Sequence, residues 1–288
     1  MLPASHHIEF ITPLFSKGFY DDLPEIRSPS IRGQLHYWFR ALGGKIAEET
    51  SIFGGVHGGA TASKVTVRVS NVTGKAETRA TLPHKRGGEA SLKMSFLPGT
   101  RFTLHLMPRL GGIDDRLKSK FDAALEAWLL MGGLGLRTTR GAGSFRWQPA
   151  ADTSGPVPPQ TFSEYDLRCR ALLEKAPLRF ALLDEEYSSA ELARHDCSDT
   201  IGGSNDHPGQ ESLAGIRDPL GRIRPTRKTS PLRFRVVGME GKFRIAALWD
   251  TRTAVTMNGD SDLKDAIRLL VGKDKAIGYQ LEKSSLAI

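Results

Sequence analysis

Hydrophobic and polar side chains alternate along several short segments in the first half of the chain. Within residues 63–72, for example, Val65, Val67 and Val69 are separated by polar residues and are predicted to face inward. This period of two is typical of a strand that buries one face. We therefore predict four strands in this half, over residues 6–12, 63–72, 101–107 and 144–148.

Two longer segments have the period of three to four residues that predicts a helix with one buried face. Ser30 and Asp114 have side chains suited to cap these two helices. On the first helix Arg32, His36 and Arg40 recur every four residues and line a different, basic face. The apolar faces predicted to join the core are Ile31, Leu35, Trp38, Phe39 and Leu42 in the first helix, and Leu117, Phe121, Leu125 and Trp128 in the second.

These elements follow the order β-α-β-β-α-β, which is the ferredoxin-like arrangement. The RNA-recognition module has the same topology, although its aromatic base-stacking consensus is not evident in this sequence. A proline-rich segment at 150–160 predicts a linker and a domain boundary.

The second half repeats part of this pattern. It contains a predicted strand and a predicted hairpin, followed by a helix that begins at Asp260 or Ser261, and its polar segment 201–221 is predicted to be a surface insertion. We therefore expect an α+β protein with two tandem ferredoxin-like domains, the second degenerate. The predicted strands are residues 178–183, 232–237 and 242–249, and the predicted domains are residues 1–150 and 151–288.

Charge indicates the class of partner. The 288 residues include 40 Lys and Arg against 32 Asp and Glu, a net charge of +8. Residues 1–150 hold 20 of these basic and 12 of these acidic residues, so the whole excess lies in the first half. A second basic cluster occupies 217–244, and such clustering is typical of proteins that bind polyanions. The two cysteines, the missing secretion signal and the lack of a long apolar run lead us to expect a cytoplasmic protein without membrane contact.

The stretch 132–145 contains five glycines and two arginines directly after the second predicted helix. Glycines let backbone N–H groups turn toward a ligand, and successive N–H groups form a concavity that binds anions. Arg137 and Arg140 add positive charge and are both expected to be exposed, so we interpret this glycine-rich loop as a phosphate site. It lacks the Lys-Ser/Thr ending of a nucleotide-triphosphate loop, which favours a nucleic-acid backbone as the ligand. The alternative is a flexible connector that carries surface arginines.

Arginines outside the loop are further phosphate candidates, because a guanidinium donates in a fork that fits phosphate. Arg27, Arg32 and Arg40 are of this kind, with a solvated helix face or internal carboxylate pairs as the alternative. Trp38 is interpreted as core, and Phe19 with Tyr20 either stacks on bases or packs a loop.

Three groups of residues suggest catalysis or metal binding without a convincing partner set. Histidines 6, 7 and 36 suggest the general base or acid of a metal-free ribonuclease. Asp21 and Asp22 suggest a metal-dependent nuclease, with a solvated loop as the favoured alternative. The segment 195–197 (His-Asp-Cys) with His207 has no usual zinc spacing. We expect no catalytic residue, no metal ion and no cofactor.

Several motifs resemble those of the RAMP superfamily of CRISPR proteins, and most of all the first RAMP subunit of type III-B (Cmr) effector complexes. His36 stands where that helix motif has arginine. The glycine-rich loop is similar to the loop that many RAMP proteins share, and 227–232 (Arg-Lys-Thr-Ser-Pro-Leu) resembles a motif of their second half. The motifs are 11–18 (Ile-Thr-Pro-Leu-Phe-Ser-Lys-Gly), 26–41 (Ile-Arg-Ser-Pro-Ser-Ile-Arg-Gly-Gln-Leu-His-Tyr-Trp-Phe-Arg-Ala), 52–55 (Ile-Phe-Gly-Gly) and 63–65 (Ser-Lys-Val).

The resemblance implies a non-catalytic subunit that caps a filament of RAMP subunits and holds the 3′ side of the CRISPR RNA and the target RNA. Its partners would be both RNAs and other RAMP subunits of a Cmr complex. A RAMP endoribonuclease that processes CRISPR RNA, or a backbone subunit that cleaves target RNA, remains the alternative. The residues expected to contact RNA are Lys17, Arg27, Ser30, Arg32, Arg40, Gly135, Arg137, Thr138, Thr139, Arg140, Gly141, Arg227 and Lys228.

Overall fold

The computed structural model describes residues 4–19, 23–56, 59–83, 91–109, 111–151, 155–202 and 230–251. The predicted helix at Asp260 or Ser261, nearly all of the predicted insertion, and Arg227 with Lys228 lie outside these residues.

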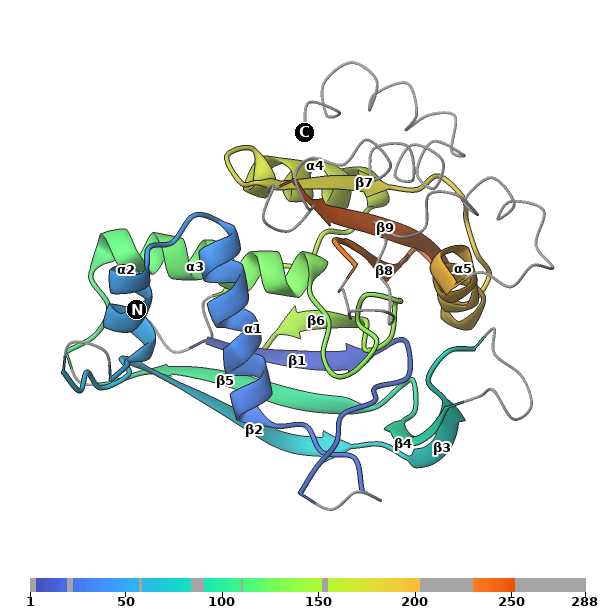
Figure 1. Ribbon diagram of the computed structural model, residues 1–288, viewed down its shortest axis with the longest axis horizontal. Helices are drawn as coiled ribbons and strands as arrows, with labels where there is room; N and C mark the ends of the chain where they lie inside the picture. The colour runs from blue at the N-terminus through green and yellow to red at the C-terminus, as the bar shows by residue number, and fades with distance from the viewer. Residues whose placement is uncertain are drawn as a thin grey trace, which may run out of the picture.

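A four-stranded antiparallel sheet carries two long helices on one face (Figure 1). Its strand order, β2-β5-β1-β6, is that of a ferredoxin-like β-α-β-β-α-β unit, so the predicted fold of the first half is confirmed. The elements of this unit are β1 (Ala4–Phe10), α1 (Ser28–Ala41), β2 (Val65–Thr73), β5 (Arg101–Pro108), α3 (Asp115–Met131) and β6 (Phe145–Pro149).

The apolar periods of the two helices are buried as predicted, but one helix start differs. Asp114 caps α3, accepting a hydrogen bond from the Leu117 N–H at 2.9 Å. The predicted cap at Ser30 is wrong, because α1 begins at Ser28 and Arg27 is its N-cap residue. Pro29 fits the first helical turn, where its fixed φ is favourable and its missing N–H costs no hydrogen bond. Ser30 is therefore an exposed residue inside the first turn.

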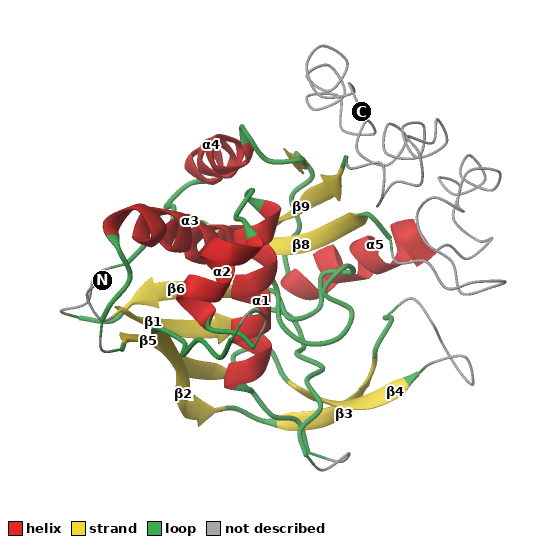
Figure 2. Cartoon of the chain, turned by 60° about the vertical axis from the view of Figure 1, so that its left-hand side comes forward, coloured by secondary structure: helices red, strands yellow, loops and turns green. Residues whose placement is uncertain are grey.

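Three short elements of the first half were not predicted: α2 (Ile46–Phe53), β3 (Ala76–Ala80) and β4 (Leu92–Phe96). The helix has only eight residues, and its start is held by a hydrogen bond from the Lys45 N–H to the Glu48 carboxylate at 3.0 Å. The two strands form an antiparallel hairpin that extends away from the sheet (Figure 2). Half of the hairpin residues are exposed and only Ser95 is buried, so the hairpin does not show the alternation by which a half-buried strand is recognised.

The second half forms a three-stranded antiparallel sheet, in the order β7-β9-β8. The predicted hairpin is confirmed, with Glu240 (φ 54°) and Gly241 (φ 75°) in its turn. The two helices that the structure describes in this half were missed. These elements are α4 (Phe162–Leu173), β7 (Leu178–Leu182), α5 (Ala190–Gly202), β8 (Leu232–Met239) and β9 (Lys242–Asp250).

The two faces of this second sheet pack on different partners. One face carries Phe180, Val237 and Leu248, which join the core of the first half. The other face carries Val236 and Trp249, which pack with α5 in a separate cluster. The boundary that we propose near residue 150 therefore separates two groups of elements along the chain, but both groups contribute to one main core.

Arg235 of β8 stabilises the junction between the two halves. Its side chain is buried, and it donates to the carbonyl oxygens of Gly132, Phe145 (2.6 Å) and Trp128 (3.4 Å). The guanidinium also lies 4.6 Å from the ring centroid of Phe145. Burial lowers the pKa of Arg235. A buried charge needs such compensation, because desolvation of an unpaired ion costs several kcal/mol.

Candidate nucleic-acid interface

The glycine-rich loop, residues 132–144, follows α3 and depends on left-handed backbone conformations. The φ angles of Gly135, Gly141 and Gly143 are +85°, +70° and +63°, and Arg137 adopts +61°. A Cβ atom on Gly135 or Gly143 would also collide with a backbone carbonyl oxygen. The glycines are therefore required for the packing of the loop itself.

Backbone N–H groups in the second part of the loop donate within the protein. The N–H of Gly141 donates to the Phe234 carbonyl at 3.1 Å, and that of Gly143 donates to the Pro13 carbonyl at 2.9 Å. Gly141 is also buried. Gly141 is predicted to contact RNA, but its N–H is not available to a phosphate, because it already donates to β8. The exposed tip of the loop is residues 135–137.

The two loop arginines differ in exposure. Arg137 is exposed at the tip, as predicted, whereas Arg140 is half-buried against β8, where it forms a parallel bridge with Phe234. Burial, with a smaller contribution from the charge of Arg137, lowers the pKa of Arg140 to about 10. Thr138 and Thr139 between them are half-buried. The expectation of two exposed arginines is thus wrong for Arg140.

The basic face of α1 contacts α2. Arg32 donates to the Phe53 carbonyl at the end of α2, His36 pairs with the buried Glu49 carboxylate, and Arg40 lies 3.4 Å from the same carboxylate. The alternative of internal carboxylate pairing therefore holds for Arg40, although 56% of its side chain stays exposed. The structure groups these three side chains around α2 and not around the loop.

Three other predicted RNA contacts are exposed. Lys17 follows a segment that lies beside the loop, because the Leu136 N–H donates to the Phe15 carbonyl at 2.7 Å. Ser30 is exposed in the first turn of α1, and Arg27 precedes that turn, 4.0 Å from Glu25. All three are accessible to a strand that crosses this side of the molecule.

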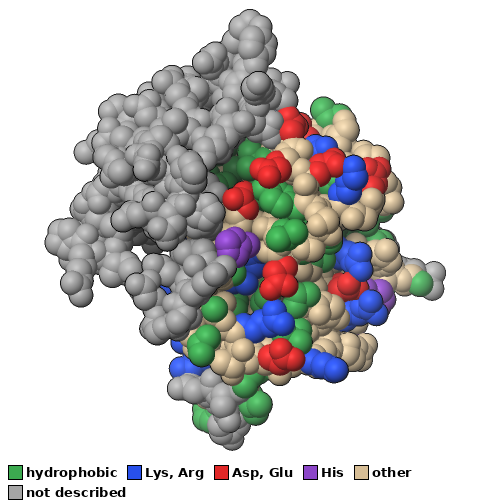
Figure 3. Space-filling view, turned by 90° about the vertical axis from the view of Figure 1, so that its right-hand side faces the viewer, with side chains coloured by type: hydrophobic (Ala, Val, Ile, Leu, Met, Phe, Trp, Pro, Cys, Tyr) green, Lys and Arg blue, Asp and Glu red, His purple; other side chains and the backbone are tan. Residues whose placement is uncertain are grey.

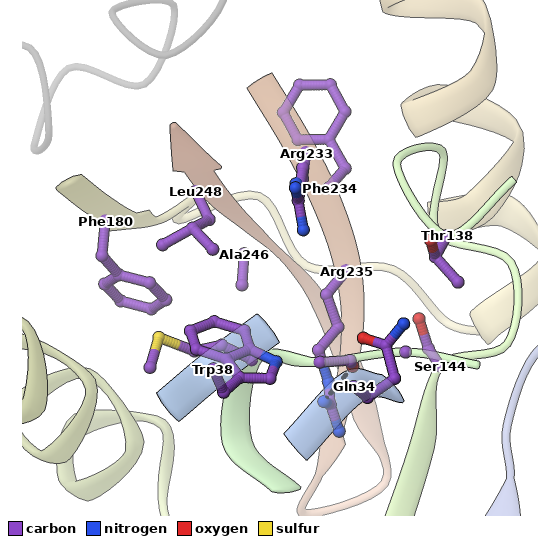
Figure 4. A pocket seen from close by; sticks show the side chains of 13 residues that line it. Gln34, Trp38, Thr138, Ser144, Phe180, Arg233, Phe234, Arg235, Ala246 and Leu248 are labelled. Atoms are coloured by element: carbon purple, nitrogen blue, oxygen red, sulfur yellow. Dashed lines mark hydrogen bonds between the residues drawn. The ribbon is translucent and has the colours of Figure 1, made fainter. Parts of the chain in front are cut away.

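A crevice between α1, the glycine-rich loop and β8 brings the predicted contact Thr138 together with residues that were not among the predicted contacts. Figure 4 shows Gln34 and Arg233 lining it beside Thr138. The Arg233 guanidinium lies over the ring of Tyr37, 4.4 Å from its centroid. The enclosed volume is about 30 Å³, room for roughly one water molecule, so a nucleotide would lie across its mouth. The sequence did carry a signal for this position. Arg233 and Arg235 are two residues apart on a predicted strand, so both cations lie on the same strand face.

Ion pairs reduce the positive charge elsewhere on the surface. In the second basic cluster, Arg244 donates to Glu186 at 2.7 Å, and Lys242 contacts the same carboxylate. Figure 3 shows basic and acidic side chains interspersed over the described part of one face. Net charge alone therefore does not locate a polyanion site.

The histidines that suggested ribonuclease chemistry do not converge. His6 is buried on the helix side of the sheet, and burial lowers its pKa to about 4. His7 is exposed and pairs across the sheet with Thr103, while His36 contacts Glu49. Among the described residues no group of three or more His, Cys, Asp or Glu could hold a metal ion. Tyr20, Asp21, Asp22 and His207 lie outside the described residues.

Residues 7–146 match the model of the RAMP superfamily. The resemblance to the RAMP superfamily inferred from the motifs is therefore confirmed over this part of the chain.

Within that superfamily the chain resembles Cmr1 proteins. It is 29% identical to CRISPR system Cmr subunit Cmr1-2 of Pyrococcus furiosus over 188 residues, covering 51% of this chain and 96% of that protein. It is 27% identical to Cmr1-1 of the same organism, covering 50% of this chain and 45% of that protein. Both matches thus cover about half of this chain.

Solved structures share the fold over more of the chain. The apo crystal structure of Cmr1 from Pyrococcus furiosus matches with a TM-score of 0.57 at 19% identity, covering 87% of this chain and 88% of that one. A chain of the type III-B Cmr-beta complex bound to cognate target RNA and AMPPnP matches with a TM-score of 0.58 at 11% identity, covering 96% and 99%. Within the described residues no helix combines the length and apolar character needed to cross a membrane.

Proposed function

We propose that this protein is a non-catalytic RNA-binding subunit of a type III-B CRISPR (Cmr) effector complex. In this role it caps the filament of RAMP subunits and holds the 3′ side of the CRISPR RNA together with the target RNA. The observation that carries the proposal is the exposed tip of the glycine-rich loop beside the crevice of Gln34 and Arg233, on a fold shared with Cmr1. Its partners are the two RNAs and neighbouring RAMP subunits, and it needs no cofactor.

The proposed contacts follow from exposure at the loop tip and from position at the crevice. Arg137 at the loop tip and Arg233 at the crevice, over Tyr37, present guanidinium groups, which bind phosphate oxygens in a bidentate manner. Arg32 and Arg140 are assigned to support, because Arg32 donates to the Phe53 carbonyl and one terminal nitrogen of Arg140 is buried. The remaining proposed contacts are Lys17, Arg27, Ser30, Arg40, Gly135, Thr138 and Thr139, with Arg227 and Lys228 outside the described residues.

The chemistry of these groups favours backbone recognition over base recognition. Guanidinium, ammonium and hydroxyl groups donate to phosphate and ribose oxygens, and such contacts carry no sequence information of their own. In RNA-guided complexes base pairing supplies the sequence specificity, so the protein needs only to hold the backbone. We therefore expect weak binding of single-stranded RNA with little sequence preference and a steep dependence on salt.

The test uses two double variants. One combines Arg137→Ala with Arg233→Ala, and the other combines Arg116→Gln with Lys118→Gln at the far end of α3 as a control that removes the same charge. RNA affinity is measured at several salt concentrations, and each variant is also mixed with the other subunits and CRISPR RNA. We expect the first variant to weaken RNA binding and shrink the salt slope by about 1.4, since each single-strand phosphate contact contributes about 0.7. Equal RNA affinity and equal incorporation for all three proteins would contradict the proposed interface. RNA cleavage that disappears in His7→Ala would contradict the non-catalytic role.

A further inference from the structure

The side of the first sheet that faces away from the helices is polar along three complete rows. We call these rows the outer sheet face. The helices and the second sheet lie on the opposite side of this sheet in both Figure 1 and Figure 2. The strand registers define the rows as Arg68-His105-Ser5, Ser70-Thr103-His7-Gln148 and Thr73-Arg101-Glu9-Arg146.

Hydrogen bonds hold several side chains of this face in place. The His105 ring lies between two hydroxyls, with Nδ1 2.9 Å from the Ser5 Oγ and Nε2 2.7 Å from the Ser70 Oγ. His7 Nδ1 lies 3.3 Å from the Thr103 Oγ1 in the next row. Side chains that are already oriented lose less conformational entropy when a ligand binds.

The third row concentrates positive charge. Glu9 accepts from Arg101 Nε at 2.8 Å and from Arg146 Nη2 at 2.6 Å, so one carboxylate holds two guanidinium groups. The arginine side chains remain 67% and 62% exposed, whereas that of Glu9 is only 20% exposed. Each guanidinium has five N–H donors, and each of these bonds uses one nitrogen. With the exposed Arg68 the three rows hold three arginines and one carboxylate, a local charge of +2.

We propose that the outer sheet face binds an RNA phosphodiester backbone, as a second contact separate from the loop and crevice. A hollow on this face, lined by His7, Arg101, Arg146 and Gln148 among others, gives the strand a place to lie. The three rows contain no Phe, Tyr or Trp, and their aromatic rings are the imidazoles of His7 and His105, which are engaged with neighbouring hydroxyls. They also contain no apolar residue, whereas the buried centre of a protein–protein interface is rich in aromatic residues and methionine. The charge and the hydroxyl and imidazole groups are complementary to a polyanion.

This inference rests on the proposed function, so the experiment separates the two. The full chain is titrated with a fluorescent single-stranded oligouridylate at several salt concentrations. Arg101→Gln with Arg146→Gln should weaken binding about tenfold, equivalent to about 0.7 kcal/mol for each arginine. Glu9→Gln removes the competing carboxylate and should tighten binding. Arg101→Lys with Arg146→Lys should retain most of the affinity, and Arg116→Gln with Lys118→Gln should behave as wild type.

Melting temperatures of all variants establish that each protein is folded. If the Arg101/Arg146 glutamine variant binds RNA like wild type while the Arg137/Arg233 variant does not, the outer sheet face is refuted and the proposed function stands. If the glutamine variant keeps its RNA affinity but fails to join the other subunits, the face is a protein interface and the inference is equally overturned. If neither variant loses affinity, both proposals fail.

Discussion

His6 is predicted to make this protein acid-sensitive. The side chain is buried in β1, neither ring nitrogen has a hydrogen-bond partner among the described residues, and Gly155 lies against the ring. Burial, with a smaller contribution from His7, lowers the His6 pKa from 6.5 to about 4. The native protein therefore holds His6 neutral at pH values where the unfolded chain protonates it.

The sign and size of the effect follow from this difference in proton binding. The unfolded chain binds more protons below about pH 6.5, so stability falls as the pH decreases toward about 4. The unfolded and native pKa values of His6 differ by about 2.5, which corresponds to a total loss of folding stability of about 3.4 kcal/mol. About 2 kcal/mol of this stability is lost by about pH 5. Above about pH 7.5 the contribution is fully present.

Urea unfolding at about pH 7.5 and about pH 5 measures the loss directly. Carboxylates add their own pH dependence, so the relevant quantity is the difference between wild type and His6→Leu, which cannot titrate. His7→Gln, on the exposed side of the same strand, is the matched control and should keep the wild-type loss. If wild type and His6→Leu lose the same stability between the two pH values, the buried neutral histidine is not the cause.

Three further predictions concern the junction and the loop. Arg235→Ala should lower the free energy of unfolding in urea by about 3–5 kcal/mol, because three buried carbonyl oxygens lose their hydrogen-bond donor. A decrease below about 1 kcal/mol would refute the role of Arg235 at the junction. Gly143→Ala should lower the free energy of unfolding by more than about 2 kcal/mol, since the new Cβ would meet a backbone carbonyl. Gly33→Ala, at an open helical position, should raise it by up to about 1 kcal/mol. Equal unfolding curves for the two variants would contradict this account of the loop. Arg137→Ala should change stability by less than about 0.5 kcal/mol while weakening RNA binding, and Arg140→Ala should lower the melting temperature; the reverse pattern would show that the exposure assignment is wrong.

Regular patterns predicted the first half well, because its strands and long helices each bury one continuous face. Ile8 and Phe10 are buried at alternate positions of β1, and Phe121 and Trp128 recur on one face of α3, so burial repeats the sequence period in these elements. In β2 only Val65 is buried. The short α2 and the exposed β3–β4 hairpin lack such a period. In α5 the buried Arg194 interrupts the apolar face. The helix α4 was missed although Phe162, Tyr165, Cys169 and Leu173 recur at helical spacing and are buried.

The candidate site was predictable as a set of residue types but not as a set of partners. The sequence around Arg40 does not show that Arg40 pairs with Glu49, because the pair forms only when a turn places α2 against α1. Arg140 looked equivalent to Arg137, yet β8, about a hundred residues further along, covers it. Arg233 gained its place beside Tyr37 only through the packing of the second sheet on the first half.

The contact of the glycine-rich loop with β8 has a consequence for solubility. β8 is the last strand of its sheet, and an uncovered edge strand offers its backbone groups to any other extended chain. The loop occupies that edge, since the Phe234 N–H donates to the Thr139 carbonyl and the Gly141 N–H donates to the Phe234 carbonyl. A fragment that begins after residue 150 would expose this edge and should aggregate, whereas the full chain, in which the loop covers it, should remain monomeric under the same conditions.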